Sequence, residues 1–335
     1  MEQLKAIILA AGKGTRMKSE LPKVVHRIDG QCLVDYVIDA AKGAGAKDIC
    51  LVVGYKHEVV EAEISHQDVQ YALQTEQLGT GHAVKCAGDF LTGGGETLIL
   101  FGDTPLITAD TLKRLKDYHR EKGNTVTVLS AMVDDPTGYG RIIRDENGNF
   151  IKSVEHKDAN EAELASHEIN SGMYIFDTKE LRQALDLLTT DNAQGEYYLP
   201  DAIQLLLKAG KKAGAYTADN ANAVLGANDC MQLNHLNVIA RELILKQHMQ
   251  NGVEIPCTDG VVIGPNVTLG KGNRILPTTI LIGNTTIGDS CVIGPNTVVS
   301  DSIVGNEITL HNVHCIACRL EDHQSPAPFS TIQGN

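Results

Sequence analysis

The sequence predicts an α/β unit built on a mainly parallel sheet, followed by a helical arm and a short left-handed parallel β-helix. Strand-like aliphatic runs alternate with helix-like segments up to about residue 225. A long stretch with helical apolar spacing follows, and from about residue 253 an aliphatic residue recurs every six positions. Alternating strands and helices are typical of βαβ units around a parallel sheet, and a six-residue repeat is typical of a β-helix.

The strand-like runs of the first part are aliphatic or β-branched. They lie at residues 5–11, 48–53, 97–101, 124–133 and 172–176. Residues 32–43 have helical spacing, with Val34, Val37, Ile38 and Ala41 on one face. Ligands of such sheets bind beyond the carboxyl ends of the strands. The glycine-rich loop after the first strand and Asp103 after a later one are therefore expected at the ligand-binding edge.

A single long helix is predicted over residues 229–251, where Gly252 supplies a stop signal. Its apolar residues are expected to form one stripe, made of Leu233, Leu236, Ile239, Ala240, Leu243 and Leu245. This helix is interpreted as a connecting arm.

The six-residue repeat predicts the β-helix. It runs through Ile263, Leu269, Ile275, Leu281, Ile287, Ile293 and Val299, and resumes after a one-residue slip at Val304, Leu310 and Ile316. Each repeat is expected to form one flat side with its aliphatic residue inside, so that three sides make a coil and the chain has just over three coils. The predicted parts are residues 1–229, the arm 230–252, the β-helix 253–320, and a tail 321–335 that either caps the open end or is disordered.

Charge and composition exclude some classes of protein. The chain has 29 Lys and Arg against 42 Asp and Glu, a net charge of −13, which argues against a general nucleic-acid binder. No apolar run approaches the roughly 20 residues of a membrane span. The eight cysteines are scattered and no secretion signal is visible, so reduced thiols and a cytoplasmic protein are expected.

The strongest motif is the glycine-rich segment 9–17, followed by Leu21-Pro22-Lys23. A glycine loop at a strand end lets backbone N–H groups approach phosphate oxygens, and Arg16 and Lys23 can neutralise a polyphosphate. The spacing differs from the P-loop, and Met17 stands where G-x-G-x-x-G requires its third glycine. The alternative is an ordinary strand–helix turn with surface cations.

The segment 9–23 resembles the signature of sugar-nucleotide pyrophosphorylases and related nucleotidyltransferases. Further segments resemble, in the same order, the N-acetylglucosamine-1-phosphate uridylyltransferases: 74–83, 101–106, 135–142, 155–159, 168–172, 192–199 and 226–229. The resemblance covers residues 4–229, with a β-helix following as in the bacterial bifunctional uridylyltransferase/acetyltransferases. It implies a Rossmann-like nucleotidyltransferase sheet and Mg²⁺-dependent conversion of UTP and N-acetylglucosamine-1-phosphate to UDP-N-acetylglucosamine, a peptidoglycan precursor, and pyrophosphate. It also implies a homotrimer assembled through the β-helix.

The same resemblance implies residue roles. Arg16 and Lys23 would stabilise the triphosphate during direct in-line attack, without a covalent enzyme intermediate. Asp103 and Asn228 would hold Mg²⁺. The nucleotide would be bound by Leu9, Ala10, Ala11, Gly12, Gln74, Gly79, Thr80, Gly102 and Asp103. The sugar would be bound by Gly140, Glu155, Asn170 and Asn228.

Each of these residues has an ordinary alternative when taken singly. An aspartate after a strand, such as Asp103, is often a helix cap or turn residue. Asn170 and Asn228 could be turn formers, and Glu155 a solvated surface acid. The occurrence of all these residues together, within segments in the family's order, favours a substrate-binding site over the separate alternatives. One departure is Phe101, where relatives often have Tyr, and only a backbone contact is expected there.

The larger departure is the short β-helix. The bifunctional enzymes place their acetyltransferase site in later coils, so no acetyltransferase activity is expected, and the non-repetitive tail favours a chain that is naturally short.

A cluster of His311, His314, Cys315, Cys318 and His323 has zinc-like composition, but ordinary packing is the preferred interpretation. Two alternative functions remain: a related nucleotidyltransferase with another sugar or base, and a non-catalytic trimeric sugar-nucleotide sensor.

Overall fold

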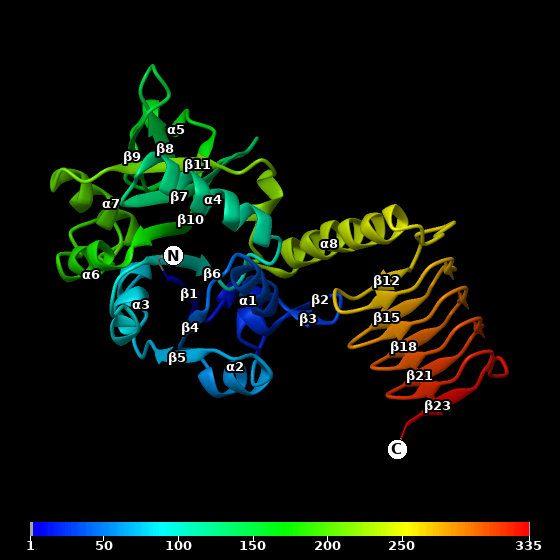
Figure 1. The fold of residues 1–335 in the computed structure, drawn as a ribbon. Coiled ribbons are helices and arrows are strands. Elements are labelled where there is room, and N and C mark those ends of the chain that lie inside the picture. Colours follow the sequence, from blue (N-terminus) through cyan, green and yellow to red (C-terminus); the bar gives the residue numbers. More distant parts are fainter. Residues whose placement is uncertain (1–2, 335) are drawn as a thin grey trace. The chain divides into compact units, whose positions relative to one another are not determined.

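The computed structural model describes residues 3–334, which form two compact units. The first unit contains the chain up to His26 together with Cys32–Gln232, and the second contains Arg27–Gln31 and the chain from Leu233 onward. The first is the α/β unit, and the second contains most of a long helix and the β-helix (Figure 1).

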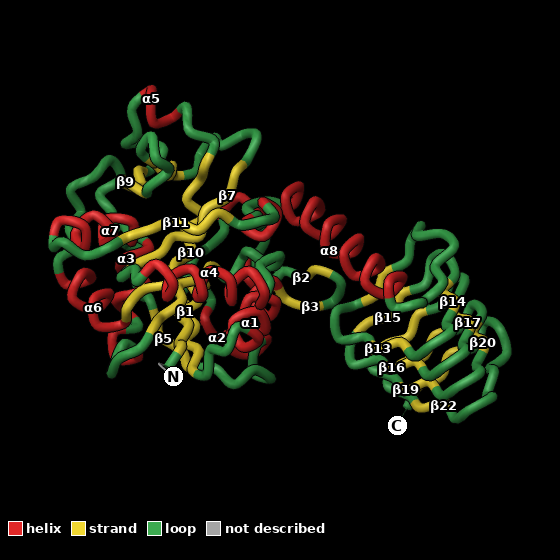
Figure 2. The backbone as a smooth tube through the Cα atoms, turned by 45° about the horizontal axis from the view of Figure 1, so that its top comes forward, coloured by secondary structure: helices red, strands yellow, loops and turns green. Residues whose placement is uncertain are grey.

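The α/β unit is organised around a mixed, mainly parallel sheet with strand order β11-β7-β10-β6-β1-β4-β5 (Figure 2). Only β10 in this path is antiparallel to its neighbours. β8 and β9 extend the sheet beside β10. The strands are β1 (Leu4–Ala10), β4 (Asp48–Val53), β5 (Gln70–Leu73), β6 (Glu96–Phe101), β7 (Val126–Met132), β8 (Gly140–Arg144), β9 (Phe150–Val154), β10 (Glu168–Asp177) and β11 (Ala213–Thr217).

Helices cover both faces of this sheet. Alternate residues of β1 point to opposite faces, and each set is buried against different helices. Leu4, Ala6 and Ile8 lie in a buried cluster with residues of α1 and α4, whereas Ile7 and Leu9 lie in a second cluster with residues of α3, α6 and α7. The helices of the unit are α1 (Leu33–Gly43), α2 (His57–Glu63), α3 (Thr80–Cys86), α4 (Ala109–Lys122), α5 (Glu161–Leu164), α6 (Thr178–Asp186) and α7 (Leu199–Lys208). Short 3-10 turns are η1 (Thr15–Met17), η2 (Lys23–Val25), η3 (Gly88–Phe90) and η4 (Ala221–Val224).

The long helix α8 spans Cys230–Gln250, as the sequence predicts, but it does not bury one continuous stripe. Leu236, Ala240 and Leu245 are its buried residues, whereas Leu243 is 49% exposed. At 3.6 residues per turn, Leu245 lies about half a turn around the helix from Leu236. The buried face therefore changes along the helix, and the prediction for Leu243 is wrong.

The β-helix has three parallel sheets, and each sheet stacks one strand from each coil (Figure 1). The first sheet contains β12 (Val262–Ile263), β15 (Ile280–Ile282), β18 (Val298–Ser300), β21 (His314–Ile316) and β23 (Thr331–Gln333). The second contains β13 (Thr268–Leu269), β16 (Thr286–Ile287), β19 (Ile303–Val304) and β22 (Arg319–Leu320), and the third β14 (Arg274–Ile275), β17 (Val292–Ile293) and β20 (Thr309–Leu310). The tail contributes β23, which pairs in parallel with β21 and so extends the first sheet.

The predicted inward residues are buried up to Leu310, except for the partly buried Leu269, and the last one is wrong. Ile316 is 40% exposed, and Cys315 is fully buried in its place. β18 and β21 pair Val299 with Cys315, and side chains alternate along a strand, so Ile316 points outward. The step from Leu310 to the inward residue is thus five residues and not six.

The histidine–cysteine cluster is not arranged as a metal site. Among residues 3–334, no three or more His, Cys, Asp or Glu side chains are grouped so that they could hold a metal ion. Cys315 and Cys318 are buried in the β-helix core, and His323 pairs with Glu307 at 3.3 Å. Packing in the β-helix core accounts for the two cysteines, and it remains the preferred interpretation of the cluster.

A small hairpin from the N-terminal part of the chain belongs to the second unit. β2 (Arg27–Ile28) and β3 (Gln31–Cys32) are joined by Asp29 and Gly30, whose φ angles are 45° and 90°. A two-residue turn with both φ angles positive is the type I′ hairpin turn. The Asp29 carbonyl oxygen lies against Gly264 of the first β-helix coil. Asp29 Oδ2 is buried without a hydrogen-bond partner, and burial raises the pKa of this carboxyl to about 6, partly opposed by the charge of Arg241.

We expect the substitution Asp29→Asn to stabilise the second unit at pH 7.5 by about 1–2 kcal/mol. The folded-state pKa lies above the ordinary value of 3.8, so wild-type stability is greatest below that value and falls as the pH rises through about 6. Asparagine removes the buried charge and accepts the left-handed backbone. Urea unfolding at pH 4 and pH 7.5 checks this, with Asp259→Asn at an exposed acid as the control. A stabilisation of equal size at both pH values would contradict the account.

Candidate active site

The glycine-rich loop follows β1 at the edge where the parallel strands β1, β4, β5 and β6 have their carboxyl ends. Ala10 and Ala11 are buried, whereas a Cβ atom at Gly12 would meet nothing within 4 Å. The backbone at Gly12 is therefore open to a ligand. Gly14 has φ of 63°, which lets the chain turn into η1.

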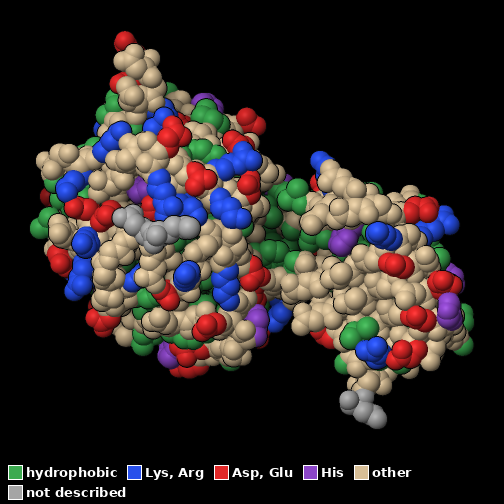
Figure 3. All heavy atoms as spheres, viewed as in Figure 1, with side chains coloured by type: hydrophobic (Ala, Val, Ile, Leu, Met, Phe, Trp, Pro, Cys, Tyr) green, Lys and Arg blue, Asp and Glu red, His purple; other side chains and the backbone are tan. Residues whose placement is uncertain are grey.

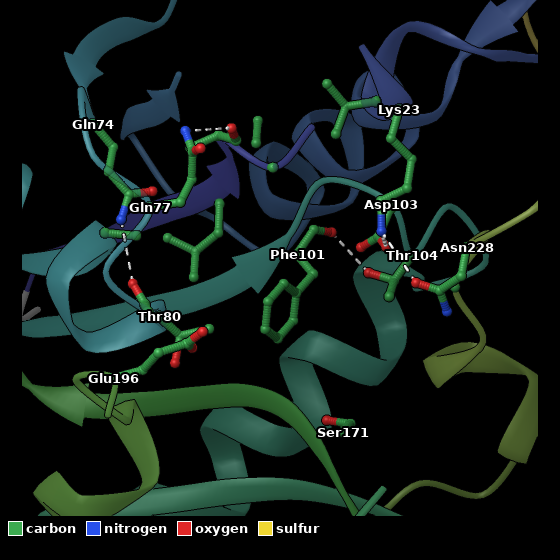
Figure 4. A pocket seen from close by; sticks show the side chains of 18 of the residues that line it. Lys23, Gln74, Gln77, Thr80, Phe101, Asp103, Thr104, Ser171, Glu196 and Asn228 are labelled. Carbon is green, nitrogen blue, oxygen red and sulfur yellow. Dashed lines mark hydrogen bonds and ion pairs between the residues drawn. The ribbon is translucent and has the colours of Figure 1, made fainter. Parts of the chain in front are cut away.

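A cavity of about 410 Å³ lies at this edge. Figure 4 shows two groups of polar side chains around it: Gln74, Gln77, Thr80 and Glu196 in one group, and Lys23, Asp103, Thr104 and Asn228 in the other, with Phe101 between the two groups. The cavity thus has an amide-rich end, which also carries the Glu196 carboxylate, and a charged end around Lys23 and Asp103.

The charged end is built around Lys23. Its ammonium group contacts the Asp103 carboxylate and donates to Asn228 Oδ1 at 3.3 Å. Arg16 Nη2 also donates to Asn228 Oδ1, at 3.0 Å. The Ala227 N–H donates to the Asp103 carbonyl oxygen at 3.2 Å, which holds the segment before Asn228 beside the end of β6.

These side chains fit a magnesium ion. The Asp103 carboxylate and the Asn228 amide oxygen converge on one cationic group, the Lys23 ammonium, so the two oxygens already share a cation site. Both are hard oxygen donors, and Mg²⁺ is commonly bound by one or two protein oxygens together with phosphates and water.

The amide-rich end is formed by residues after β5. The Gln74 N–H donates to the Val53 carbonyl oxygen at 2.7 Å, and the Gln77 side chain donates to the Ala11 carbonyl oxygen at 3.4 Å. Gly79 has φ of 107°, and a Cβ atom there would lie 2.7 Å from the Tyr197 carbonyl oxygen. Only glycine therefore fits at this turn into α3.

A second cavity of about 250 Å³ adjoins the first, and both are lined by Thr80, Phe101, Tyr139 and Ser171. Gly140, Glu155 and Asn170 line the second cavity. Burial raises the pKa of the Glu155 carboxyl, and the charges of Asp158 and Asp201 raise it further.

Asn170 is held firmly in this second cavity. Its side-chain amide donates to Ser153 Oγ at 2.8 Å and to the Tyr174 hydroxyl at 2.9 Å, and its oxygen accepts from the Gly172 N–H at 2.8 Å. The side chain is therefore fixed before any ligand arrives.

Most of the sequence-predicted residues lie at these two cavities. The first is lined by Leu9, Ala10, Ala11, Gly12, Lys23, Gln74, Gly79, Thr80, Asp103 and Asn228, and the second by Gly140, Glu155 and Asn170. Gly102 is buried, and its N–H donates to the Leu9 carbonyl oxygen at 2.9 Å, so it lines neither cavity. Arg16 is exposed and reaches the site only through Asn228. The ligand roles of all these residues remain predictions.

Sequence reasoning missed several lining residues. Gln77, Thr104, Tyr139, Ser171 and Glu196 lie at the first cavity. All five fall inside segments that carry the family resemblance, so membership of those segments was the available signal. Ser171 lies where the pairing of β10 with β7 shifts, between Asn170 and Tyr174, and an irregularity of this kind has no clear sequence signature.

Gly172 allows Phe101 to approach the irregular part of β10. Gly172 has φ of 77°, and a Cβ atom there would lie 2.2 Å from Phe101 Cε2. We expect Gly172→Ala to lower the free energy of unfolding by about 2–4 kcal/mol, because the steric conflict adds to the backbone strain. In the control Gly148→Ala, φ is 80° but the space is open, so only the strain of about 1 kcal/mol is expected. Equal losses in urea unfolding would show that the Phe101 contact contributes nothing.

On the face shown in Figure 3, acidic and basic side chains are interspersed over the first unit. No helix among the described residues has the length and apolar character needed to cross a membrane.

A glycine loop, an oxygen pair and cations beside a cavity are typical of enzymes of the nucleotidyl-transfer class. The sequence model of the family described as "Nucleotidyl transferase" matches residues 5–230. The "Bifunctional protein GlmU" of Caldanaerobacter subterraneus subsp. tengcongensis is 48% identical over 333 residues, covering 99% of this chain and 72% of the relative. Proteins of the same name from Clostridioides difficile and Bacillus velezensis are each 43% identical, covering 98% and 99% of this chain and 72% and 73% of the relatives. The chain therefore belongs to the nucleotidyl transferase family, in its GlmU-type branch, which confirms the resemblance seen in the sequence motifs.

Proposed function

We propose that this protein transfers the uridylyl group of UTP to N-acetylglucosamine-1-phosphate, giving UDP-N-acetylglucosamine and pyrophosphate. The observation that carries the proposal is the pair of adjoining cavities, one with an amide-rich end and a charged end, the other with a half-buried acid and a fixed amide. A nucleotide and a sugar phosphate in adjoining cavities would have their reacting groups close together, and such positioning is a large part of catalysis by transfer enzymes.

The charged end would bind the triphosphate. Lys23 and Arg16 stabilise negative charge on the phosphates as the sugar phosphate attacks the α-phosphorus in line. Asp103 and Asn228 would hold Mg²⁺, which supplies charge neutralisation when bound. The phosphate oxygen of the sugar substrate is the nucleophile, so no covalent enzyme intermediate is required.

The other residues would recognise the substrates. Gln74 offers hydrogen-bonding groups to the uracil edge, and Gly79 and Thr80 line the base and ribose. Glu155 and Asn170 would bind sugar hydroxyls and the N-acetyl group beside Gly140. A half-buried acid that lines a cavity discriminates against a sugar that leaves it without a hydrogen-bond partner.

Two further expectations concern the β-helix. We propose that it assembles three copies of the chain, which is supported by the family resemblance and by the exposed aliphatic residues Ile303 and Ile316. Sedimentation at micromolar concentration checks this. The chain aligns with 72% of the first relative, and we expect these 335 residues assayed alone to show no acetyl transfer to glucosamine-1-phosphate.

Pyrophosphate release tests the proposed reaction. UTP with N-acetylglucosamine-1-phosphate is expected to give strong turnover in the presence of Mg²⁺. Glucosamine-1-phosphate, glucose-1-phosphate and other nucleoside triphosphates are expected to give little. Turnover with a different pair would favour a related nucleotidyltransferase, and no turnover from folded protein would favour the sensor.

A further inference from the structure

We propose that His82 is a positioning residue that fixes the orientation of the Gln74 side-chain amide, and that it thereby strengthens the preference for uracil over cytosine. The inference rests on the proposed function, because it assigns a base preference to the same nucleotide site.

The orientation of Gln74 follows from its two nearest partners. Gln74 is only 4% exposed, and its Nε2 lies 3.2 Å from the Gly79 carbonyl oxygen and 3.1 Å from His82 Nδ1. A backbone carbonyl oxygen can only accept a hydrogen bond, so the amide atom that faces it must be the nitrogen. In Figure 4 a dashed line starts at the amide nitrogen of Gln74 and marks its hydrogen bond to the Gly79 carbonyl oxygen.

The protonation of His82 follows in turn. The amide nitrogen of Gln74 carries two hydrogens and no acceptor, so it donates one to Gly79 and one to His82 Nδ1. A neutral imidazole that accepts at Nδ1 carries its proton on Nε2. His82 Nε2 faces Cys86 Sγ at 3.9 Å, one helical turn further along α3. Burial raises the pKa of the Cys86 thiol, so the sulfur is neutral and serves as a weak acceptor.

Both hydrogens of the Gln74 amide are thus used within the protein, and only its oxygen is left to contact a base. Uracil presents an N–H donor at N3, whereas cytosine presents a lone pair there. An amide oxygen facing N3 accepts from uracil and is repelled by cytosine. Turning the amide over would place its oxygen against the Gly79 carbonyl oxygen. It would also require the proton of His82 to move from Nε2, where it faces Cys86 Sγ, to Nδ1, so two partners oppose the orientation that suits cytosine.

Substitutions at His82 separate this role from a merely structural one. His82→Phe keeps a ring but removes the acceptor, and His82→Asn restores an accepting oxygen near the place of Nδ1. The dissociation constants of UTP and CTP are measured for each protein by competition with a labelled uridine nucleotide. We expect His82→Phe to reduce the UTP/CTP affinity ratio about three- to tenfold, the usual net value of one hydrogen bond, and His82→Asn to recover most of the ratio.

The matched control is Lys85→Ala, an exposed residue of the same helix, which should leave the ratio unchanged. Equal weakening of UTP and CTP by His82→Phe, with the ratio preserved, would overturn the proposal. Should His82→Phe fail to fold, nitrogen-15 NMR of the wild-type histidines decides. A proton on Nε2 of His82 supports the proposal, and a proton on Nδ1 overturns it. Wild-type turnover with UTP reports on the proposed function separately from both readouts.

Discussion

Replacing Lys23 with methionine is expected to lower the rate of uridylyl transfer by about 100- to 1000-fold, the range seen when one charge-stabilising donor is removed from a transition state. Lys23 lies at the charged end of the cavity, in contact with both Asp103 and Asn228. Methionine keeps most of the side-chain volume and removes the charge. Steady-state kinetics with saturating substrates measure the effect as a fall in kcat.

Metal binding gives Lys23→Met a second readout. The Lys23 ammonium contacts both the Asp103 carboxylate and the Asn228 side-chain oxygen, so its removal should raise the affinity of these oxygens for Mn²⁺ used as a paramagnetic probe. The control Lys113→Met changes an exposed lysine of α4 and should alter neither quantity. Normal kcat in Lys23→Met would remove Lys23 from the proposed machinery.

The substitution Asp103→Asn is expected to lower kcat by about 1000-fold, because Asp103 supplies the charged one of the two proposed metal-binding oxygens and a bound metal ion contributes several kcal/mol to such reactions. The shape of the side chain is nearly unchanged, so the fold should persist. This change should weaken Mn²⁺ binding, whereas Lys23→Met should strengthen it. The two variants together show whether each residue raises or lowers the affinity for the metal ion.

Asp117→Asn, at an exposed position of α4, is the matched control for Asp103→Asn. Titration of kcat against Mg²⁺ concentration distinguishes weak metal binding from a lost positioning contact. Full activity of Asp103→Asn at ordinary Mg²⁺ concentrations would contradict the assigned role.

The strands and the repeat were predictable because their signal is the spacing of apolar residues within short segments of the sequence. Asp48–Val53 is bounded in the structure as the sequence predicts, and the six-residue repeat places Ile263, Leu281 and Val299 in one stack. Local pattern and tertiary packing agree at these positions, so the structure there can be predicted from the sequence.

Other features depended on contacts between distant residues. Cys315 faces inward, and Ile316 does not, because the pairing of β21 with β18 places Cys315 beside the inward Val299. Both side chains are apolar, so the sequence alone does not show which of them is buried. The strand predicted at residues 172–176 extends back to Glu168 and runs antiparallel to its neighbours, and a direction of this kind has no local signal.

The site shows the same division. The glycine loop, Lys23, Gln74 and Asp103 could be found from motifs, because those residue types suit phosphate, base and metal chemistry. The place of Arg16 outside the cavity, the burial of Gly102, and the bond from Gln74 to His82 follow from three-dimensional packing. Spacing along the chain does not encode these relations.

A crystal structure with UDP-N-acetylglucosamine bound would test the account most directly. We predict the uracil ring against Gln74 and Gly79, and the N-acetylated sugar in the adjoining cavity beside Gly140, Glu155 and Asn170. The diphosphate is predicted to lie near Lys23, between the base and the sugar. A sugar bound away from Glu155 and Asn170, or a base bound away from Gln74, would contradict the account.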